Sequence, residues 1–311
     1  MSALSKSPAG PALRRFSRWT PTTQGIVLIL LAILVFTLMD ALAKSLISRH
    51  PTLQVVWARY TGQTVLVALL LCRVGFSHLR AQHPWLQVWR SLFQFGASFF
   101  FFASLNYIGL AEATAIADLN PVLITLGAVL FLGERIGVRR AIGIAVALAG
   151  AMLIIKPGSS VFSVAALLPL GCGICFAGYA LITRAVGARE TVWTSLAYTA
   201  LFGTIVTSAS LPWVWQTPDW SDVPGFVVIG VMGAVAQLCL IRSFVLADAA
   251  VVAPFSYLGL VFAMVWGWLF FGQLPDLWSL FGALVIMAAG LYVWHREARA
   301  TRQVAPVNSG T

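Results

Sequence analysis

Ten apolar segments, separated by short polar stretches, run through almost the whole chain. Each is close to the roughly 20 residues that an α-helix needs to cross the hydrocarbon core of a bilayer. The pattern predicts an all-α integral membrane protein with ten transmembrane helices. The segments span residues 25–47, 53–75, 85–109, 112–132, 138–156, 161–184, 192–214, 223–245, 249–271 and 277–295.

A repeated motif divides this pattern into two halves of five helices. The stretch Leu110–Glu134 returns in altered form at Leu246–Gln273. Both copies begin with Leu-Ala-acid-Ala, carry a proline further on, and end on Phe-x-Gly followed by an acid or an amide. Because five is odd, the second half enters the membrane from the opposite side, which gives two inverted repeats. The expected divisions are a tail at 1–22, repeats at 23–156 and 161–296, and a tail at 297–311.

Composition and charge place the chain in a membrane and give its orientation. Of the 311 residues, 59% are hydrophobic and only 10% are charged, whereas soluble domains carry about 25% charged residues. The net charge of +10 comes from basic residues in loops, so it does not indicate a nucleic-acid partner. Cytoplasmic loops are rich in Lys and Arg, and this rule predicts that both termini are cytoplasmic in a multi-pass protein of the cell (inner) membrane. One side of the predicted helices carries Lys6, Arg14, Arg15, Arg18, Arg73, Arg80, Arg135, Arg139, Arg140, Arg184, Arg189, Arg296, Arg299 and Arg302, and the other only Lys44, Arg49 and Lys156.

Motifs of enzymes and of ATP-driven pumps are missing from the sequence. HExxH, GxSxG, the P-loop and the dinucleotide fingerprint do not occur. Cys172 and Cys175 have CxxC spacing, but they lie in an apolar segment with no second pair, so we interpret them as packing residues. We therefore expect no enzyme activity, no cofactor and no metal site. A secondary carrier remains.

The repeated motif and two further stretches resemble the EamA family of the drug/metabolite transporter superfamily. The resemblance covers about residues 25–295 and implies two inverted five-helix units, a central cavity and transport of small metabolites, often amino acids. Gln273 stands where many members of the family have Glu. The matching stretches are Leu110-Ala-Glu-Ala-Thr-Ala, Phe131-Leu-Gly-Glu134, Ala247-Asp-Ala-Ala-Val-Val-Ala-Pro-Phe, Phe270-Phe-Gly-Gln273, Met39-Asp-Ala-Leu-Ala-Lys44 and Trp57-Ala-Arg-Tyr60.

Three embedded charges are the strongest candidates for a site. A charge at the middle of a membrane helix costs about 2.5–3.5 kcal/mol on insertion scales, so it needs a reason. By helical rise, Asp40 and Arg59 lie roughly 10–12 Å from the outer ends of their helices, and Asp118 roughly 9 Å. In one interpretation Asp40 pairs with Lys44 or Arg59 and locks the first hairpin. In the other, Arg59 receives a substrate carboxylate, while Asp40 or Asp118 binds an ammonium group or takes a proton.

Further candidates are helix-breaking prolines, aromatic side chains and buried amides. Pro121 and Pro254 interrupt segments 112–132 and 249–271, and interrupted helices in corresponding halves indicate a binding site between them. Arg90 is expected to extend to the lipid headgroups. Packing between helices is the alternative role for the aromatic and amide side chains. These candidates are Trp57, Tyr60, Tyr179, Tyr198, Tyr257, Asn106, Asn120 and Gln237.

The resulting prediction is a secondary transporter that moves an amino acid or related zwitterion by alternating access, with export favoured over uptake. The mixed signs of Asp40, Arg59 and Asp118 favour a zwitterion. The alternatives are an exporter of cationic drugs or quaternary amines and an S-adenosylmethionine carrier. The expected partners are a small-molecule substrate and the lipid bilayer, with a coupled proton as an option. We expect a monomer.

Overall fold

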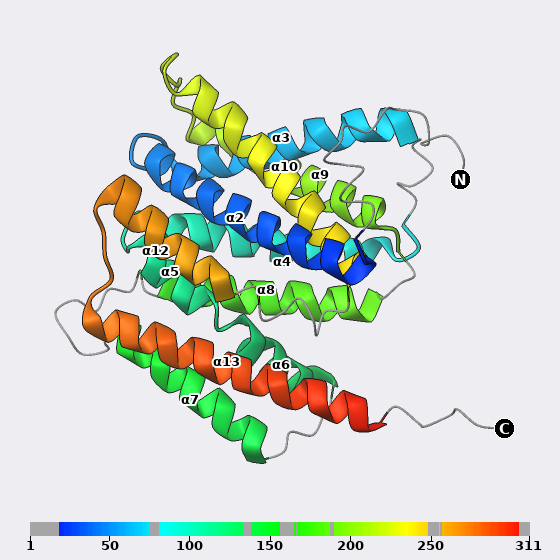
Figure 1. Ribbon diagram of the computed structural model, residues 1–311. Coiled ribbons are helices and arrows are strands. Elements are labelled where there is room, and N and C mark those ends of the chain that lie inside the picture. The colour runs from blue at the N-terminus through cyan, green and yellow to red at the C-terminus, as the bar shows by residue number, and fades with distance from the viewer. Residues whose placement is uncertain are drawn as a thin grey trace.

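A computed structural model describes residues 19–74, 81–132, 138–155, 165, 167–186, 190–247, 255 and 257–304. Within these ranges the chain forms helices and no strands (Figure 1). The α-helices are α2 (Pro21–Ile47), α3 (Thr52–Val74), α4 (Pro84–Ser104), α5 (Leu110–Ala117), α6 (Asn120–Leu132), α7 (Val138–Ile155), α8 (Leu167–Val186), α9 (Val192–Ser210), α10 (Val223–Leu246), α12 (Leu258–Phe271) and α13 (Leu277–Val304), and a short 3₁₀ helix, η4, covers Leu211–Trp213.

Local sequence explains several helix ends. Thr20 precedes α2 and its hydroxyl accepts a hydrogen bond from Thr23 N at 3.3 Å, which satisfies one free donor of the first turn. Thr191 does the same for α9, at 3.1 Å from Thr194 N. At the other end of α12, Gly272 adopts a left-handed backbone with φ 62°, and this explains the glycine of the Phe-x-Gly motif.

Several predicted segments differ from the observed helices, and three of the differences have a local cause. Segment 85–109 was too long, because α4 ends at Ser104, whose hydroxyl donates to the Phe101 carbonyl at 2.6 Å and so competes with the helical ladder. Segment 192–214 was also too long, because Pro212 begins a tight turn after Ser210. Segment 112–132 is divided into α5 and α6 just before Pro121.

The lengths and surfaces of the helices are those of a multi-pass membrane protein. Pro21–Ile47, Thr52–Cys72 and Val223–Ser243 are long and apolar enough to span a bilayer, with mean hydropathies of 2.8, 1.5 and 2.1. Large apolar side chains such as Leu69 and Ile205 point outward, where lipid would cover them. The shorter apolar helices are Ala141–Ile155, Leu167–Thr183, Leu258–Phe271 and Leu277–Tyr292.

Helix packing relates the two halves of the chain. The contacts of α2 with α10 and of α3 with α10 have counterparts in those of α8 with α4 and of α9 with α4. The contact of α2 with α12 corresponds to that of α8 with α5 and α6. Equivalent helices of the two halves also meet directly, as α3 with α9, α5 with α12, and α7 with α13, the last pair lying side by side at the lower edge of Figure 1. This pairing is what a two-fold relation between the halves produces.

Candidate substrate site

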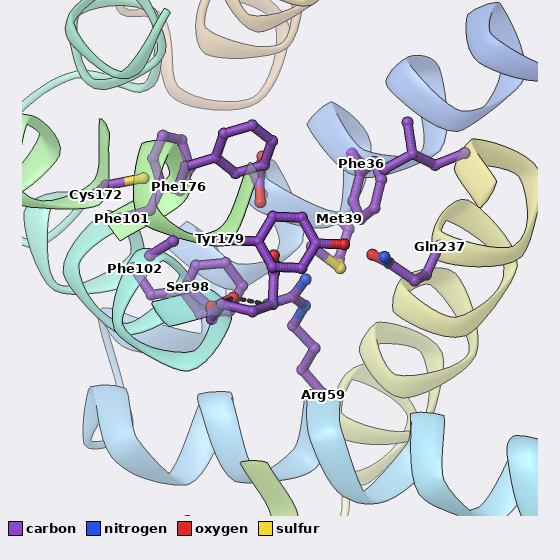
Figure 2. Close-up of a pocket in the computed structure, with 14 residues that line it drawn as sticks. Phe36, Met39, Arg59, Ser98, Phe101, Phe102, Cys172, Phe176, Tyr179 and Gln237 are labelled. Atoms are coloured by element: carbon purple, nitrogen blue, oxygen red, sulfur yellow. Dashed lines mark hydrogen bonds between the residues drawn. The ribbon is translucent and has the colours of Figure 1, made fainter. Parts of the chain in front are cut away.

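A cavity of about 180 Å³ lies between α2, α3, α4, α8 and α10. Both halves of the chain contribute to it, and its walls combine aromatic rings with a few polar groups (Figure 2). Such a combination of an apolar wall and sparse polar groups is typical of small-molecule sites. The lining residues are Phe36, Met39, Asp40, Arg59, Gln94, Ala97, Ser98, Phe101, Phe102, Cys172, Phe176, Tyr179, Gln237 and Leu240.

Arg59 is held in the cavity wall by a set of α4 contacts. Its side chain is only 5% exposed, and its Nη1 donates to Ser98 Oγ, as Figure 2 shows. Tyr60 Oη lies 3.0 Å from Ser98 Oγ and 3.3 Å from the Gln94 carbonyl. The guanidinium lies over the rings of Tyr60 and Phe102, at 5.2 and 5.8 Å from their centres. Arg59 is therefore fixed before any substrate arrives.

Asp40 lines the same cavity as Arg59. Lys44, one turn further along α2, donates instead to the Ile108 carbonyl at 2.7 Å and lies over the Phe271 ring at 5.7 Å. The ion pairs seen among the described residues join Asp222 to Arg49 and His50 and do not include Asp40. A direct lock of Asp40 with Lys44 or Arg59 is therefore not the arrangement found here. The Asp40 carboxylate and the Arg59 guanidinium line the same cavity, where each can bind a ligand.

Tyr179 on α8 contributes an aromatic ring to the cavity wall. Figure 2 shows its hydroxyl directed toward the Gln237 amide across the cavity. Behind the ring, the Arg90 guanidinium lies 5.2 Å from its centre and Arg90 Nη2 donates to the Ser195 carbonyl at 2.7 Å and to Thr199 Oγ1 at 3.0 Å. The prediction that Arg90 extends to the headgroups is wrong: it is 5% exposed and joins α4 to α9, because α9 offers it buried oxygen acceptors.

Four of the predicted site residues line the cavity: Asp40, Arg59, Tyr179 and Gln237. Tyr60 is one layer behind, where it supports Arg59. Trp57 lies away from the cavity, since its Nε1 donates to Ser208 Oγ at 3.0 Å and its ring packs edge-on against Trp215.

The remaining predicted residues lie further away. Asn106 is exposed in the turn after α4 and donates to Thr52 Oγ1 at 2.9 Å. Tyr198 sits on α9 outside the cavity lining. Tyr257 precedes α12, and its hydroxyl occupies the space that Gly290 of α13 leaves. Pro254 lies outside the described residues.

Asp118, Asn120 and Pro121 form a second polar region at the break between α5 and α6. Asp118 caps the end of α5, and Asn120 begins α6. Asp118 Oδ2 and Asn120 Oδ1 are buried without a hydrogen-bond partner. The structure thus separates Asp118 from the layer that the sequence predicted for it with Asp40 and Arg59.

A family model described as the EamA-like transporter family matches residues 23–156 and 163–294. The chain belongs to this family. The resemblance drawn from the repeated motifs is therefore confirmed, and the match occurs twice along the chain, once in each half.

Several named transporters are similar to this chain over most of their length. A riboflavin transporter of Rhizobium johnstonii is 30% identical over 288 residues, which cover 90% of this chain and 94% of that protein. The pseudopaline exporter CntI of Pseudomonas aeruginosa is 32% identical over 277 residues, covering 85% and 94%. An S-adenosylmethionine uptake transporter of Rickettsia bellii is 25% identical over 276 residues, covering 89% and 95%. Transport of a small molecule is the function that these relatives share.

A solved crystal structure has the same fold as this EamA-like transporter. It superposes with a TM-score of 0.62, covers 90% of this chain and 99% of its own, and is 21% identical in sequence. At this identity the likeness shows the fold alone.

Sequence reasoning missed most of the cavity wall, including Ser98, Phe102 and Cys172. A signal for Ser98 was present, because it lies one helical turn after Gln94 and continues a polar face of α4 that begins at Gln87. Phe102 belongs to a run expected to face lipid in part, yet it is only 1% exposed. Apolar residues give no such signal in a membrane protein, because lipid-facing and cavity-facing positions have similar composition.

Proposed function

We propose that this EamA-like transporter is a secondary carrier of a small zwitterionic metabolite of the amino-acid type. The observation that carries the proposal is that Asp40 and Arg59 line one cavity while Arg59 Nη1 is bonded to Ser98 rather than to the acid. A substrate carboxylate would accept hydrogen bonds from the guanidinium. The ammonium group of the substrate would bind the Asp40 carboxylate. The two ends of one substrate molecule would thus replace the water around Arg59 and around Asp40.

The size of the cavity also favours a small substrate. At about 180 Å³ it lies below the roughly 300–1,000 Å³ of sites for drug-sized ligands. Five aromatic rings stand around the charged pair, on Phe36, Phe101, Phe102, Phe176 and Tyr179. An amino acid with an apolar or aromatic side group matches these walls.

The first experiment is a thermal-shift measurement on the detergent-purified protein with a panel of amino acids, S-adenosylmethionine and quaternary amines. A ligand that binds only the folded state raises its apparent stability. We expect zwitterions to raise the melting temperature of the wild type and to lose this effect in Arg59→Ala. Stabilisation by zwitterions that is equal in Arg59→Ala and the wild type would overturn the proposed role of Arg59.

A cationic substrate, such as a quaternary amine or S-adenosylmethionine, is the second candidate. It is favoured by the aromatic faces beside Asp40, which suit a cation, and by the name of the Rickettsia bellii relative. This candidate predicts stabilisation by cations alone, with little effect of Arg59→Ala. The same panel therefore separates the two substrate classes.

The transport cycle that we propose is alternating access by two inverted halves, in a monomer with both termini in the cytoplasm. The equivalent packing of the halves and the five predicted spans in each support it. The test uses single cysteines in a background without the four native ones. In intact cells, an impermeant thiol reagent should label Trp220→Cys between α9 and α10, and His83→Cys before α4 only after permeabilisation. Labelling of both from outside would contradict the topology.

A further inference from the structure

The break between α5 and α6 is a gap in the helical hydrogen-bond ladder inside the bundle. Asp118 N still donates to the Thr114 carbonyl at 2.8 Å, and Leu119 N to the Ile116 carbonyl at 3.2 Å, so α5 closes tightly. Pro121 has no N–H group, and the Ala117 carbonyl therefore loses the partner that a continuous helix would give it. The break exposes an acceptor at the negative end of the α5 dipole.

Two side-chain oxygens belong to the residues that follow this carbonyl along the chain. Asp118 Oδ2 and Asn120 Oδ1 are both buried and have no hydrogen-bond partner. A Cβ atom at Gly173 of α8 would lie 2.9 Å from Leu123 Cδ1, 3.5 Å from Asn120 Oδ1 and 3.7 Å from the Ala117 oxygen. Two of the three oxygens therefore lie beside the same point on α8, which Leu123 also packs against. All three oxygens are hydrogen-bond acceptors.

The charged and titratable neighbours leave Asp118 without a counter-charge. Cys172 on α8 interacts electrostatically with both Asp118 and Asp40, and Tyr257 interacts with Asp118 from the start of α12. Arg59 also acts on Cys172, but it is bound to Ser98 at the cavity. Among the described residues no Lys, Arg or His forms an ion pair with Asp118. A buried carboxylate in this position is costly unless a cation neutralises it.

We propose that the α5–α6 break binds one monovalent cation, H⁺ or Na⁺, through Asp118 Oδ2, Asn120 Oδ1 and the Ala117 carbonyl. One carboxylate balances one positive charge, and interrupted helices in carriers supply such oxygen ligands to coupling ions. Cys172 lines the substrate cavity and also adjoins Asp118, so the cation site and the cavity share a wall on α8. The coupling role rests on the proposed transport function, whereas cation binding does not.

The test compares the melting temperature of the purified full-length protein in two titrations without substrate. In the first, N-methyl-D-glucamine chloride is replaced by NaCl at constant ionic strength and fixed pH. In the second, the pH is lowered in N-methyl-D-glucamine chloride alone. The variants are Asp118→Asn, Gly173→Ala, which adds a methyl group against Leu123 and beside two of the oxygens, and Asp219→Asn as the matched control, an exposed acid between α9 and α10.

We expect the wild type to gain roughly 2–4 °C in one titration, Asp118→Asn to lose this gain, Gly173→Ala to reduce it and Asp219→Asn to keep it. A gain with NaCl identifies Na⁺, and a gain only on acidification identifies H⁺. The site is refuted if the wild type responds to neither, or if Asp118→Asn responds as the wild type does. If Asp118→Asn does not fold, Gly173→Ala and Asn120→Leu decide in its place, since both leave the acid intact. Zwitterion binding in the same assay separates this result from the substrate proposal.

Discussion

Asp40 and Asp118 are similar in sequence but occupy two different regions of the molecule. Each is an acid embedded in an apolar segment, at a comparable distance from the predicted outer surface. In the structure Asp40 faces a cavity together with Arg59, two amides and several aromatic rings. Asp118 instead lies at a helix break beside oxygens that only accept hydrogen bonds.

This difference shows that the neighbours of an embedded acid, more than its depth, decide what it can bind. The cavity offers a fixed donor and an acid, and so matches a ligand that carries both signs. The break offers an acid and acceptors, and so matches a cation alone. If the cavity binds substrate and the break binds a coupling ion, substitutions in the two regions should affect different ligands.

Arg59→Ala should produce the largest effect on zwitterion affinity. Hydrogen bonds to charged groups contribute about 1.5–3 kcal/mol, and the loss of a bidentate pair at the upper part of this range weakens binding about 30- to 150-fold. Thermal shift or calorimetry with the best amino acid of the panel would measure this change. Arg59→Lys, which keeps the charge and loses the planar fork, should recover only part of the affinity.

A charge exchange tests whether Asp40 and Arg59 act on a ligand or on each other. The double variant Asp40→Arg with Arg59→Asp would restore a structural ion pair but would reverse the polarity of a binding site. We therefore expect affinity to stay lost in the double variant, while each single variant also binds weakly. Recovery of wild-type affinity in the exchange would show that the pair acts as a structural lock.

Ser98→Ala should have the next largest effect, although Ser98 would act by positioning Arg59. Its hydroxyl accepts from Arg59 Nη1 and donates to the Gln94 carbonyl at 3.1 Å. Losing it leaves a buried charged donor unsatisfied, at a cost of about 1–3 kcal/mol, part of which the guanidinium can recover by turning. We expect about tenfold weaker zwitterion binding, measured as for Arg59→Ala.

Ser98→Thr is the matched control, because it keeps the hydroxyl and adds one methyl group. It should retain most of the affinity. If Ser98→Ala and Ser98→Thr bind the ligand equally well, Arg59 does not depend on this contact.

Most of the fold was predictable because bilayer thickness constrains helix length. Segment positions, the two halves and the family followed from apolar periodicity and from the motif that occurs at Leu110–Glu134 and again at Leu246–Gln273. The division of segment 112–132 was signalled by Pro121. The early end of α4 was harder to predict, because Ser104 is also compatible with a membrane helix and competes with the ladder only through its local hydrogen bond.

Residues of the candidate site could be predicted only where a charged side chain stands in an otherwise apolar helix. Asp40 and Arg59 stand out in an apolar chain, and the structure brings both to the cavity. The depth argument could not separate Asp118 from them, since depth along a helix does not say which face a side chain occupies. Aromatic residues were the least predictable: Tyr179 lines the cavity, whereas Trp57 packs against Trp215, and packing and binding use the same apolar surface.

Pro121→Ala should affect the break more than the cavity. Alanine supplies an N–H group that can bond the Ala117 carbonyl, and this would remove one acceptor from the proposed cation site and favour a continuous helix. We expect the cation-dependent rise in melting temperature to fall by roughly half or more. The melting temperature without the cation should be higher than that of the wild type. Zwitterion affinity should change by less than about threefold, which corresponds to roughly 0.6 kcal/mol.

A loss of zwitterion affinity in Pro121→Ala as large as that in Arg59→Ala would show that the two regions form one site. In that case the separation between Asp40 and Asp118 would describe a single conformation of the carrier. Equal cation responses in Pro121→Ala and the wild type would instead remove the Ala117 carbonyl from the proposed ligands.

Asn106→Ala should have the smallest effect on ligand binding, because Asn106 lies outside both the cavity and the break. Asn106 was a candidate for substrate contact, but it lies in the exposed turn after α4 and bonds to Thr52 Oγ1 and the Ala103 carbonyl. An exposed hydrogen bond of this kind is worth about 0.5–1.5 kcal/mol at most, so a small loss of stability is expected. Zwitterion affinity and the cation response should both stay within about twofold of the wild type in the same thermal-shift assays. A larger loss of either would mean that the turn after α4 contacts a ligand during the transport cycle and forms a third binding region beside the cavity and the break.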